Sequence, residues 1–121
     1  MVLVVDDDCD IGNLLVVVLR SAEIDGHFER GGPAALAWLQ EHRPILIILD
    51  VNMPGMSGLE FLKILKSDPA LSHIPVVMHT ALDDGPLVSY AKDLGAVGTL
   101  FKGRYQIGEI TNMVNAFALL K

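Results

Sequence analysis

Residues 45–60 read ILIILDVNMPGMSGLE, an apolar run that ends on an acid and continues into a turn rich in Gly and Met. The run Ile45–Leu49 is apolar at every position, so the predicted strand must be covered on both of its faces. Such strands are typical of a parallel sheet that carries helices on both sides. This stretch therefore predicts the central strand of an α/β fold, with Asp50 directly at its end.

Outward from this strand, short apolar runs alternate with segments of helical period, without repeats or linkers. The expected strands are Val2–Val5, Gly26–Arg30, Ile45–Leu49, Ile74–Thr80 and Gly98–Lys102. The expected helices are a segment around Ile11–Leu19, then Pro33–His42, Ser57–Lys66, Pro86–Gly95 and Ile107–Leu120. Strict alternation of five strands and five helices predicts a doubly wound α/β sheet.

The composition narrows the class of protein. A chain of 121 residues with 51% hydrophobic and 20% charged residues has the size of one ordinary domain with its own core. The net charge of −6 argues against direct binding of nucleic acid, which rewards clustered Lys and Arg. The single cysteine, Cys9, cannot form an intramolecular disulfide, and no apolar run approaches the ~20 residues of a membrane span. We therefore expect a cytoplasmic protein that does not enter a membrane.

Polar side chains gather at the predicted strand ends, where doubly wound sheets bind their ligands. They are Asp6, Asp7 and Asp8 after the first strand, Asp50 after the third, Thr80 at the fourth and Lys102 at the fifth. Each has a simpler interpretation when taken alone: Asp8 or Asp10 can cap a helix, and Asp50 can begin an ordinary turn. These interpretations do not explain why several acids converge beside one lysine.

This set of residue types suits a hard divalent cation and phosphoryl transfer. Mg²⁺ prefers oxygen ligands and is typically held by one or two carboxylates together with phosphate oxygens. No Cys/His cluster indicates zinc. A carboxylate can itself accept a phosphoryl group, and the transfer needs a metal, a cation and a hydroxyl around the phosphoryl oxygens.

Four segments, VLVVDDD, ILDVNMPGMSG, VMHTA and LFKG, resemble in order and spacing the receiver domain of two-component response regulators, the family of the single-domain chemotaxis regulator. The resemblance covers the whole chain and implies one receiver domain over residues 1–121. It also implies a flavodoxin-like fold, with a five-stranded parallel sheet of order 2-1-3-4-5 flanked by five helices.

The resemblance implies a role for each strand-end residue. Asp50 would be the phosphoacceptor and Asp7 a direct metal ligand, while Asp6 would act through a water molecule and Asn52 through its backbone carbonyl. Thr80 would hydrogen-bond a phosphoryl oxygen, and Lys102 would pair with Asp50 or its phosphate. The implied ion is Mg²⁺, with Mn²⁺ as an alternative.

The implied partners are a histidine kinase or a histidine phosphotransfer protein, together with an output partner or a fused effector domain. The chain would then be a signalling domain and not an enzyme, beyond phosphorylating itself and slowly losing the phosphoryl group. We expect no contact between this domain and nucleic acid or membrane.

Three positions depart from the family pattern. Ser57 replaces an acid and is expected to cap the following helix, with Glu60 completing a capping box. Thr99 stands where the family has its switch aromatic, so no ring can swing inward there. Gly103 replaces the usual proline after the lysine, and a cis bond to a non-proline residue costs about 2.5–4 kcal/mol. The Lys102–Gly103 bond is therefore expected to be trans.

Two other functions fit the same fold. A metal-dependent phosphohydrolase with an aspartyl nucleophile usually has a second acid two residues later, where this chain has Asn52, and a cap domain for which there is too little chain. A flavin-binding module is disfavoured because three acids repel a phosphate in the absence of metal. His79 is expected to be a core histidine or a helix contact, facing away from Thr80, and not a proton carrier.

Overall fold

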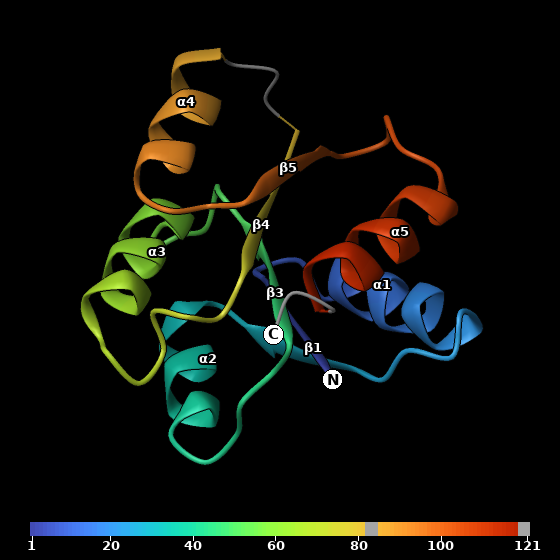
Figure 1. Ribbon diagram of the computed structural model, residues 1–121, viewed down its shortest axis with the longest axis horizontal. Coiled ribbons are helices and arrows are strands. Elements are labelled where there is room, and N and C mark those ends of the chain that lie inside the picture. Colours follow the sequence, from blue (N-terminus) through green and yellow to red (C-terminus); the bar gives the residue numbers. More distant parts are fainter. Residues whose placement is uncertain (82–84, 119–121) are drawn as a thin grey trace.

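The computed structural model describes residues 1–81 and 85–118 (Figure 1). Its strands are β1 (Val2–Asp6), β2 (Gly26–Arg30), β3 (Leu46–Asp50), β4 (Val76–Thr80) and β5 (Gly98–Phe101). Its helices are α1 (Cys9–Ser21), α2 (Gly32–Leu39), α3 (Gly58–Ser67), α4 (Gly85–Asp93) and α5 (Ile107–Ala118). All neighbouring strands are parallel and follow the order β2-β1-β3-β4-β5, which confirms the predicted fold.

Helices cover the sheet in two layers. Figure 1 shows α2, α3 and α4 on one side of the sheet and α1 and α5 on the other. Two apolar clusters correspond to these layers: one joins residues of α2, α3 and α4 to the sheet, and the other joins residues of α1 and α5 to it. The three inner strands β1, β3 and β4 are buried at every residue. Burial on both faces is what the unbroken apolar run of β3 predicted.

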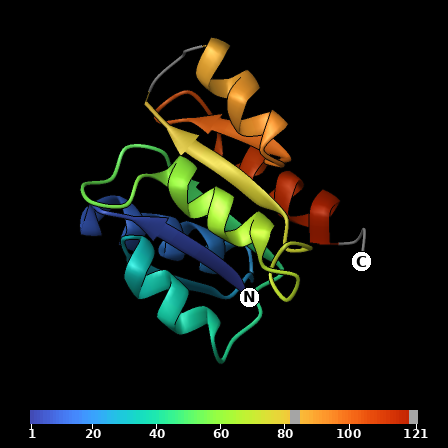
Figure 2. The ribbon, with the colours of Figure 1, turned by 90° about the vertical axis from the view of Figure 1, so that its left-hand side faces the viewer.

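The parallel pairing brings all carboxyl ends of the strands to one edge of the sheet. Figure 2 shows the arrows of β1 and β4 pointing the same way, with the chain's N-terminus at the start of β1. Pairing aligns Val5 with Leu49 and Asp50 with His79, so the ends of β1, β3 and β4 lie side by side. The fold therefore assembles the predicted site from segments far apart in the sequence.

Several predicted boundaries were wrong by a few residues. β3 begins and ends one residue later than expected, so that Asp50 is its last residue, and β1 likewise extends to Asp6. The second helix ends at Leu39 and not at His42. β4 begins only after Pro75, a residue that cannot donate a hydrogen bond to a neighbouring strand. Leu119 and Leu120, the expected end of the last helix, lie outside the described residues.

Local signals mark three helix ends, among them the predicted caps Asp8 and Ser57. The Asp8 side chain caps α1 by accepting hydrogen bonds from the backbone N–H groups of Asp10 and Ile11. Ser57 caps α3 by accepting from the N–H of Glu60, although the Glu60 carboxylate meets the Ser57 hydroxyl and not its backbone as in a full capping box. Gly95 ends the α4 segment in a left-handed conformation with a φ of 110°.

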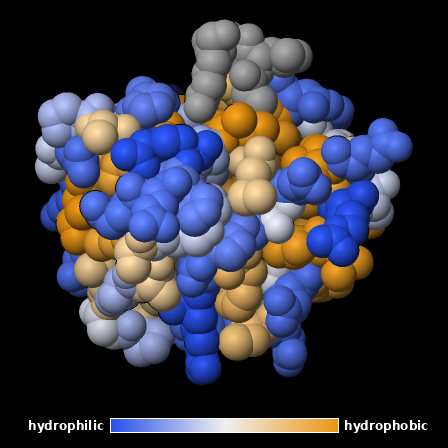
Figure 3. All heavy atoms as spheres, turned by 90° about the horizontal axis from the view of Figure 1, so that it is seen from below, coloured by the Kyte–Doolittle hydropathy of each residue, from blue (hydrophilic) through white to orange (hydrophobic). Residues whose placement is uncertain are grey.

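Polar and apolar side chains are interspersed on the face shown in Figure 3. Among the described residues, no helix has the length and apolar character needed to cross a bilayer.

Gly58 provides a test of how tightly α3 is held against the end of β3. A Cβ atom at this position would lie 2.1 Å from the Asp50 carbonyl oxygen and 2.8 Å from the Val51 Cα, and backbone cannot move aside easily. Gly58→Ala is therefore expected to lower the free energy of unfolding by about 1–3 kcal/mol in urea titrations. Gly108→Ala, in α5 with open space around the new methyl group, is the control and is expected to be neutral or stabilising by up to about 1 kcal/mol. Equal stability of the two variants would contradict the tight contact.

Candidate functional site

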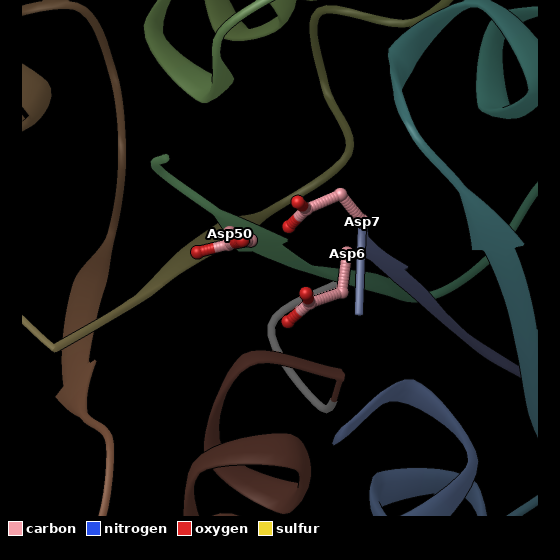
Figure 4. A group of neighbouring side chains, drawn as sticks. All are labelled: Asp6, Asp7 and Asp50. Carbon is pink, nitrogen blue, oxygen red and sulfur yellow. The ribbon is translucent and has the colours of Figure 1, made fainter. Parts of the chain in front are cut away.

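Three carboxylates meet at the carboxyl edge of the sheet. Asp6 and Asp50 are the last residues of β1 and β3, and Asp7 follows directly after β1. One carboxylate oxygen from each of the three residues lies within 4.8 Å of the others. Figure 4 shows the side chains of Asp6 and Asp7 leaving the end of β1 toward Asp50. The prediction that these acids converge is confirmed.

Lys102, directly after β5, joins the acids. Its Nζ atom lies 3.1 Å from Oδ1 of Asp50 and 3.7 Å from Oδ2 of Asp6. The side chains of the two acids are 2% and 1% exposed, whereas that of Lys102 is 22% exposed. One partly exposed cation thus faces two buried carboxylates, which leaves the group with excess negative charge.

Asp6 has one carboxylate oxygen that is available to a cation. Its Oδ1 accepts from the backbone N–H of Asp8 at 2.9 Å. Its Oδ2 is buried and has no hydrogen-bond donor in the described part of the chain, only the ionic contact with Lys102. Buried carboxylate oxygens normally have a partner. The unpaired Asp6 oxygen and the two neighbouring carboxylates together are oxygen ligands of the kind that a hard divalent ion prefers.

The pKa of Asp50 is raised from 3.8 to about 6. The main cause is burial, which disfavours the charged form, and the negative charge of Asp6 adds to it. The Lys102 ammonium opposes the rise through its hydrogen bond and its charge. The Asp50 carboxylate is therefore poorly solvated, more basic than usual and held in place by a lysine.

Thr80 and Asn52 lie at the same edge of the sheet. Thr80 is buried at the end of β4, one residue beyond the residue that pairs with Asp50, and its carbonyl accepts from the Lys102 backbone N–H at 2.7 Å. The Asn52 N–H donates to Oδ1 of Asp50 at 3.4 Å. Their contacts to a phosphoryl group and to a metal stay predictions.

Arg30 also borders the site, although it was not singled out from the sequence. It ends β2, and its Nε donates to the backbone carbonyl of Asp7 at 3.1 Å. The strand-end rule that selected the other residues would have selected this one too. Two further residues missed as part of the site, His79 and Tyr105, form a hydrogen bond behind it.

Comparison with known proteins identifies the family. The family model described as "Response regulator receiver domain" matches residues 2–115. The chain belongs to the response regulator receiver family.

Relatives and solved structures agree with this assignment. The chain is 37% identical to the DNA-binding response regulator MtrA of Mycobacterium tuberculosis over 101 residues, which cover 84% of this chain and 43% of MtrA. It thus spans less than half the length of that relative. The solved structure of the Vibrio cholerae chemotaxis protein CheY4 is 30% identical, with a TM-score of 0.88 and 96% of each chain covered. The Mn²⁺-bound form of response regulator Rcp1 is 32% identical, with a TM-score of 0.74 and 95% of this chain and 88% of that chain covered.

Two departures of this receiver domain from the family pattern have visible consequences. The Lys102–Gly103 bond is trans, as predicted, and Gly103 adopts a left-handed φ of 76°. Thr99 lines a gap beneath α4 with Thr80, Leu87 and Ala91, and the gap is too narrow for a water molecule. Thr99 also lines an open hollow of about 350 Å³ together with Val88 and Lys92 of α4 and Phe101 of β5.

The raised pKa of Asp50 predicts how the stability of the receiver domain depends on pH without metal. The folded pKa lies above the unfolded one, so the folded state binds more protons between about pH 4 and pH 6. The stabilisation is present below pH 4 and is lost as the pH rises to 6. The two pKa values differ by roughly 2, which corresponds to a loss on the order of 3 kcal/mol. Asp50→Asn removes this titration.

Urea titrations from pH 4 to pH 7 in EDTA test this prediction. The stability of the Asp50→Asn variant relative to the native protein is expected to increase through the window from pH 4 to pH 6 and then to level off. Parallel curves for the two proteins would show that Asp50 titrates normally.

Proposed function

We propose that this receiver domain is a phosphorylation-dependent switch of a two-component phosphorelay, in which Asp50 accepts the phosphoryl group. The observation that carries the proposal is the buried Asp50 carboxylate, held 3.1 Å from Lys102 and grouped with Asp6 and Asp7. A catalytic nucleophile benefits from such fixed placement, since positioning and electrostatics supply most of the acceleration in phosphoryl transfer.

In the proposed step, a carboxylate oxygen of Asp50 attacks the phosphorus atom of a phosphohistidine. The new P–O bond forms as the P–N bond breaks, and the electron pair of that bond returns to the imidazole of the donor. Lys102 offsets negative charge on the transferring group, and Thr80 donates its hydroxyl to a phosphoryl oxygen. Because the attacking carboxylate is poorly solvated, little water has to leave it before the reaction.

Asp6, Asp7 and Asp50, with the backbone carbonyl of Asn52, would hold Mg²⁺ or Mn²⁺. The orphaned oxygen of Asp6 and the all-oxygen donor set support this assignment. A similar protein, Rcp1, was solved in a Mn²⁺-bound form. When bound, the ion would neutralise charge on the phosphoryl oxygens and bring them close to the carboxylates.

The proposed donor is a histidine kinase or a histidine phosphotransfer protein in the cytoplasm. The net charge of −6 disfavours direct contact with nucleic acid, so an effect on DNA would pass through another domain or partner. We propose a signalling role and not turnover as a phosphohydrolase, because Asn52 offers no acid at the position where such an enzyme places its general acid/base. A generic phosphomonoester should therefore not be turned over rapidly.

The phosphoacceptor can be tested with a small phosphodonor and mass spectrometry. Asp50→Asn keeps the shape of the side chain but removes the nucleophile, so Mg²⁺-dependent labelling is expected to fall to background. Asp68→Asn makes the same chemical change at a half-buried residue that accepts from the Ala70 N–H, away from the carboxylate group, and is expected to label normally. Full labelling of the Asp50→Asn variant would place the acceptor elsewhere.

The metal assignment predicts a response to Mg²⁺ in thermal melts. Like charges a few ångströms apart cost on the order of 1–4 kcal/mol, and a cation bound only by the folded state relieves this cost. Mg²⁺ at ten times its dissociation constant should stabilise the fold by about 1.4 kcal/mol, a rise of several degrees that EDTA reverses. Asp7→Asn should melt higher than the native protein without metal and respond less to Mg²⁺.

Melts of both proteins at matched ionic strength decide the question. A native protein that is indifferent to millimolar Mg²⁺ would remove the basis for a metal site at these carboxylates.

A further inference from the structure

A buried histidine lies in the same row of the sheet as the phosphorylation site. Strand pairing aligns Asp50 with His79, and neighbours in register on parallel strands point to the same face. The residues two positions earlier, Ile48 and Val77, both belong to the apolar cluster under α1 and α5. His79 therefore lies beside Asp50 on that face, and it is 2% exposed. Thr80, the next residue, points to the other layer.

His79 is bonded to the connection that follows Lys102. Its Nε2 lies 2.8 Å from the hydroxyl oxygen of Tyr105, and the two ring centroids are 5.6 Å apart at 58°. The other ring nitrogen, Nδ1, is buried and has no hydrogen-bond partner in the described part of the chain. The bond to Tyr105 thus orients the imidazole.

The connection from Lys102 to Tyr105 contains a pivot. Gly103 has a left-handed φ of 76°, and no atom lies within 4 Å of the place where a Cβ would be. The Lys102 N–H is fixed to the Thr80 carbonyl, and the Arg104 N–H to the Phe101 carbonyl. Beyond the glycine, the Tyr105 hydroxyl attaches the chain to the sheet at His79. The segment is therefore held by hydrogen bonds on both sides of Gly103, which is itself exposed.

His79 and Tyr105 interact electrostatically with Lys102 and Asp6, but neither carries a charge of its own at pH 7. Burial, and to a smaller extent the charge of Lys102, lower the pKa of His79 to about 4. Burial and the negative charge of Asp6 raise the pKa of Tyr105. Both side chains are consequently neutral at pH 7, and the hydrogen bond between them is retained over the physiological range.

We propose that the His79–Tyr105 hydrogen bond is a positioning element for Lys102. By holding the connection after Gly103, it keeps the Lys102 ammonium between Asp50 and Asp6. This inference rests on the proposed phosphorylation of Asp50. His79 and Tyr105 are positioning residues: they act through the lysine and do not touch the phosphoryl group.

Tyr105→Phe tests the proposal because it removes one hydroxyl and keeps the ring. With the bond lost, Lys102 should occupy its position for less of the time, and the rate of Mg²⁺-dependent labelling at Asp50 by a small phosphodonor should fall about three- to tenfold. Tyr90→Phe, the same change at the other tyrosine of the chain, lies on α4 at an exposed position and should label at the native rate.

The Mg²⁺ dependence of the melting temperature separates positioning from general loosening of the site. Asp6 and Asp7 are untouched in Tyr105→Phe, so the apparent Mg²⁺ affinity should stay native while the labelling rate at saturating Mg²⁺ falls. An affinity that falls in parallel with the rate would show a loosened site and would overturn the positioning role.

A double-mutant cycle that combines Tyr105→Phe with His79→Leu tests the hydrogen bond at its other partner. If the two residues act as one unit, the double variant should label no more slowly than the slower single variant, whereas independent effects would multiply and contradict the proposal. His79→Gln, whose amide can form a hydrogen bond with the Tyr105 hydroxyl, should recover part of the rate. Labelling of Tyr105→Phe at the native rate overturns the proposal, whereas native protein that is not labelled at all refutes the proposed function itself.

Discussion

The contact between Lys102 and the buried carboxylates of Asp50 and Asp6 is the interaction on which the site depends. Carboxylates that are 1–2% exposed repel one another, and one ammonium group offsets only part of that repulsion. The arrangement persists because Asp6 and Asp50 end strands that are buried at every residue, so the acids cannot separate without disturbing the core. The apolar core thus maintains a cluster of charge that would not form by itself.

The site residues that lie at the end of a strand could be predicted from the sequence. Asp6, Asp50 and Lys102 stand at the ends of predicted strands, and parallel strands present their carboxyl ends at one edge, so these residues were predicted to lie together. The same reasoning applies to Arg30, the last residue of the predicted second strand, although it was not singled out. The predicted end of α2 was wrong because residues 40–42 favour a helix locally, whereas the helix in the structure ends at its last buried residue, Leu39.

The hydrogen bond between His79 and Tyr105 could not have been predicted in this way. The two residues are 26 positions apart, and neither belongs to a motif that specifies the other. Because successive strand residues point to opposite faces, the sequence correctly predicted that His79 faces away from Thr80. The position of its partner Tyr105, however, depends on the path of the chain after Lys102. That path is set by the trans bond and left-handed φ at Gly103, a local conformation that only glycine adopts without strain.

One environment explains the behaviour of both Asp50 and His79. Burial disfavours charge of either sign, so it raises the pKa of the acid to about 6 and lowers that of the base to about 4. A charged histidine at this position would face Lys102 and weaken its attraction to Asp50, whereas a neutral one leaves that attraction intact. A purely apolar residue would also leave that attraction intact, but it would offer the Tyr105 hydroxyl no hydrogen-bond partner. A neutral imidazole therefore meets two requirements of this row at once: it adds no charge beside the lysine, and it supplies a polar atom for the chain that carries the lysine.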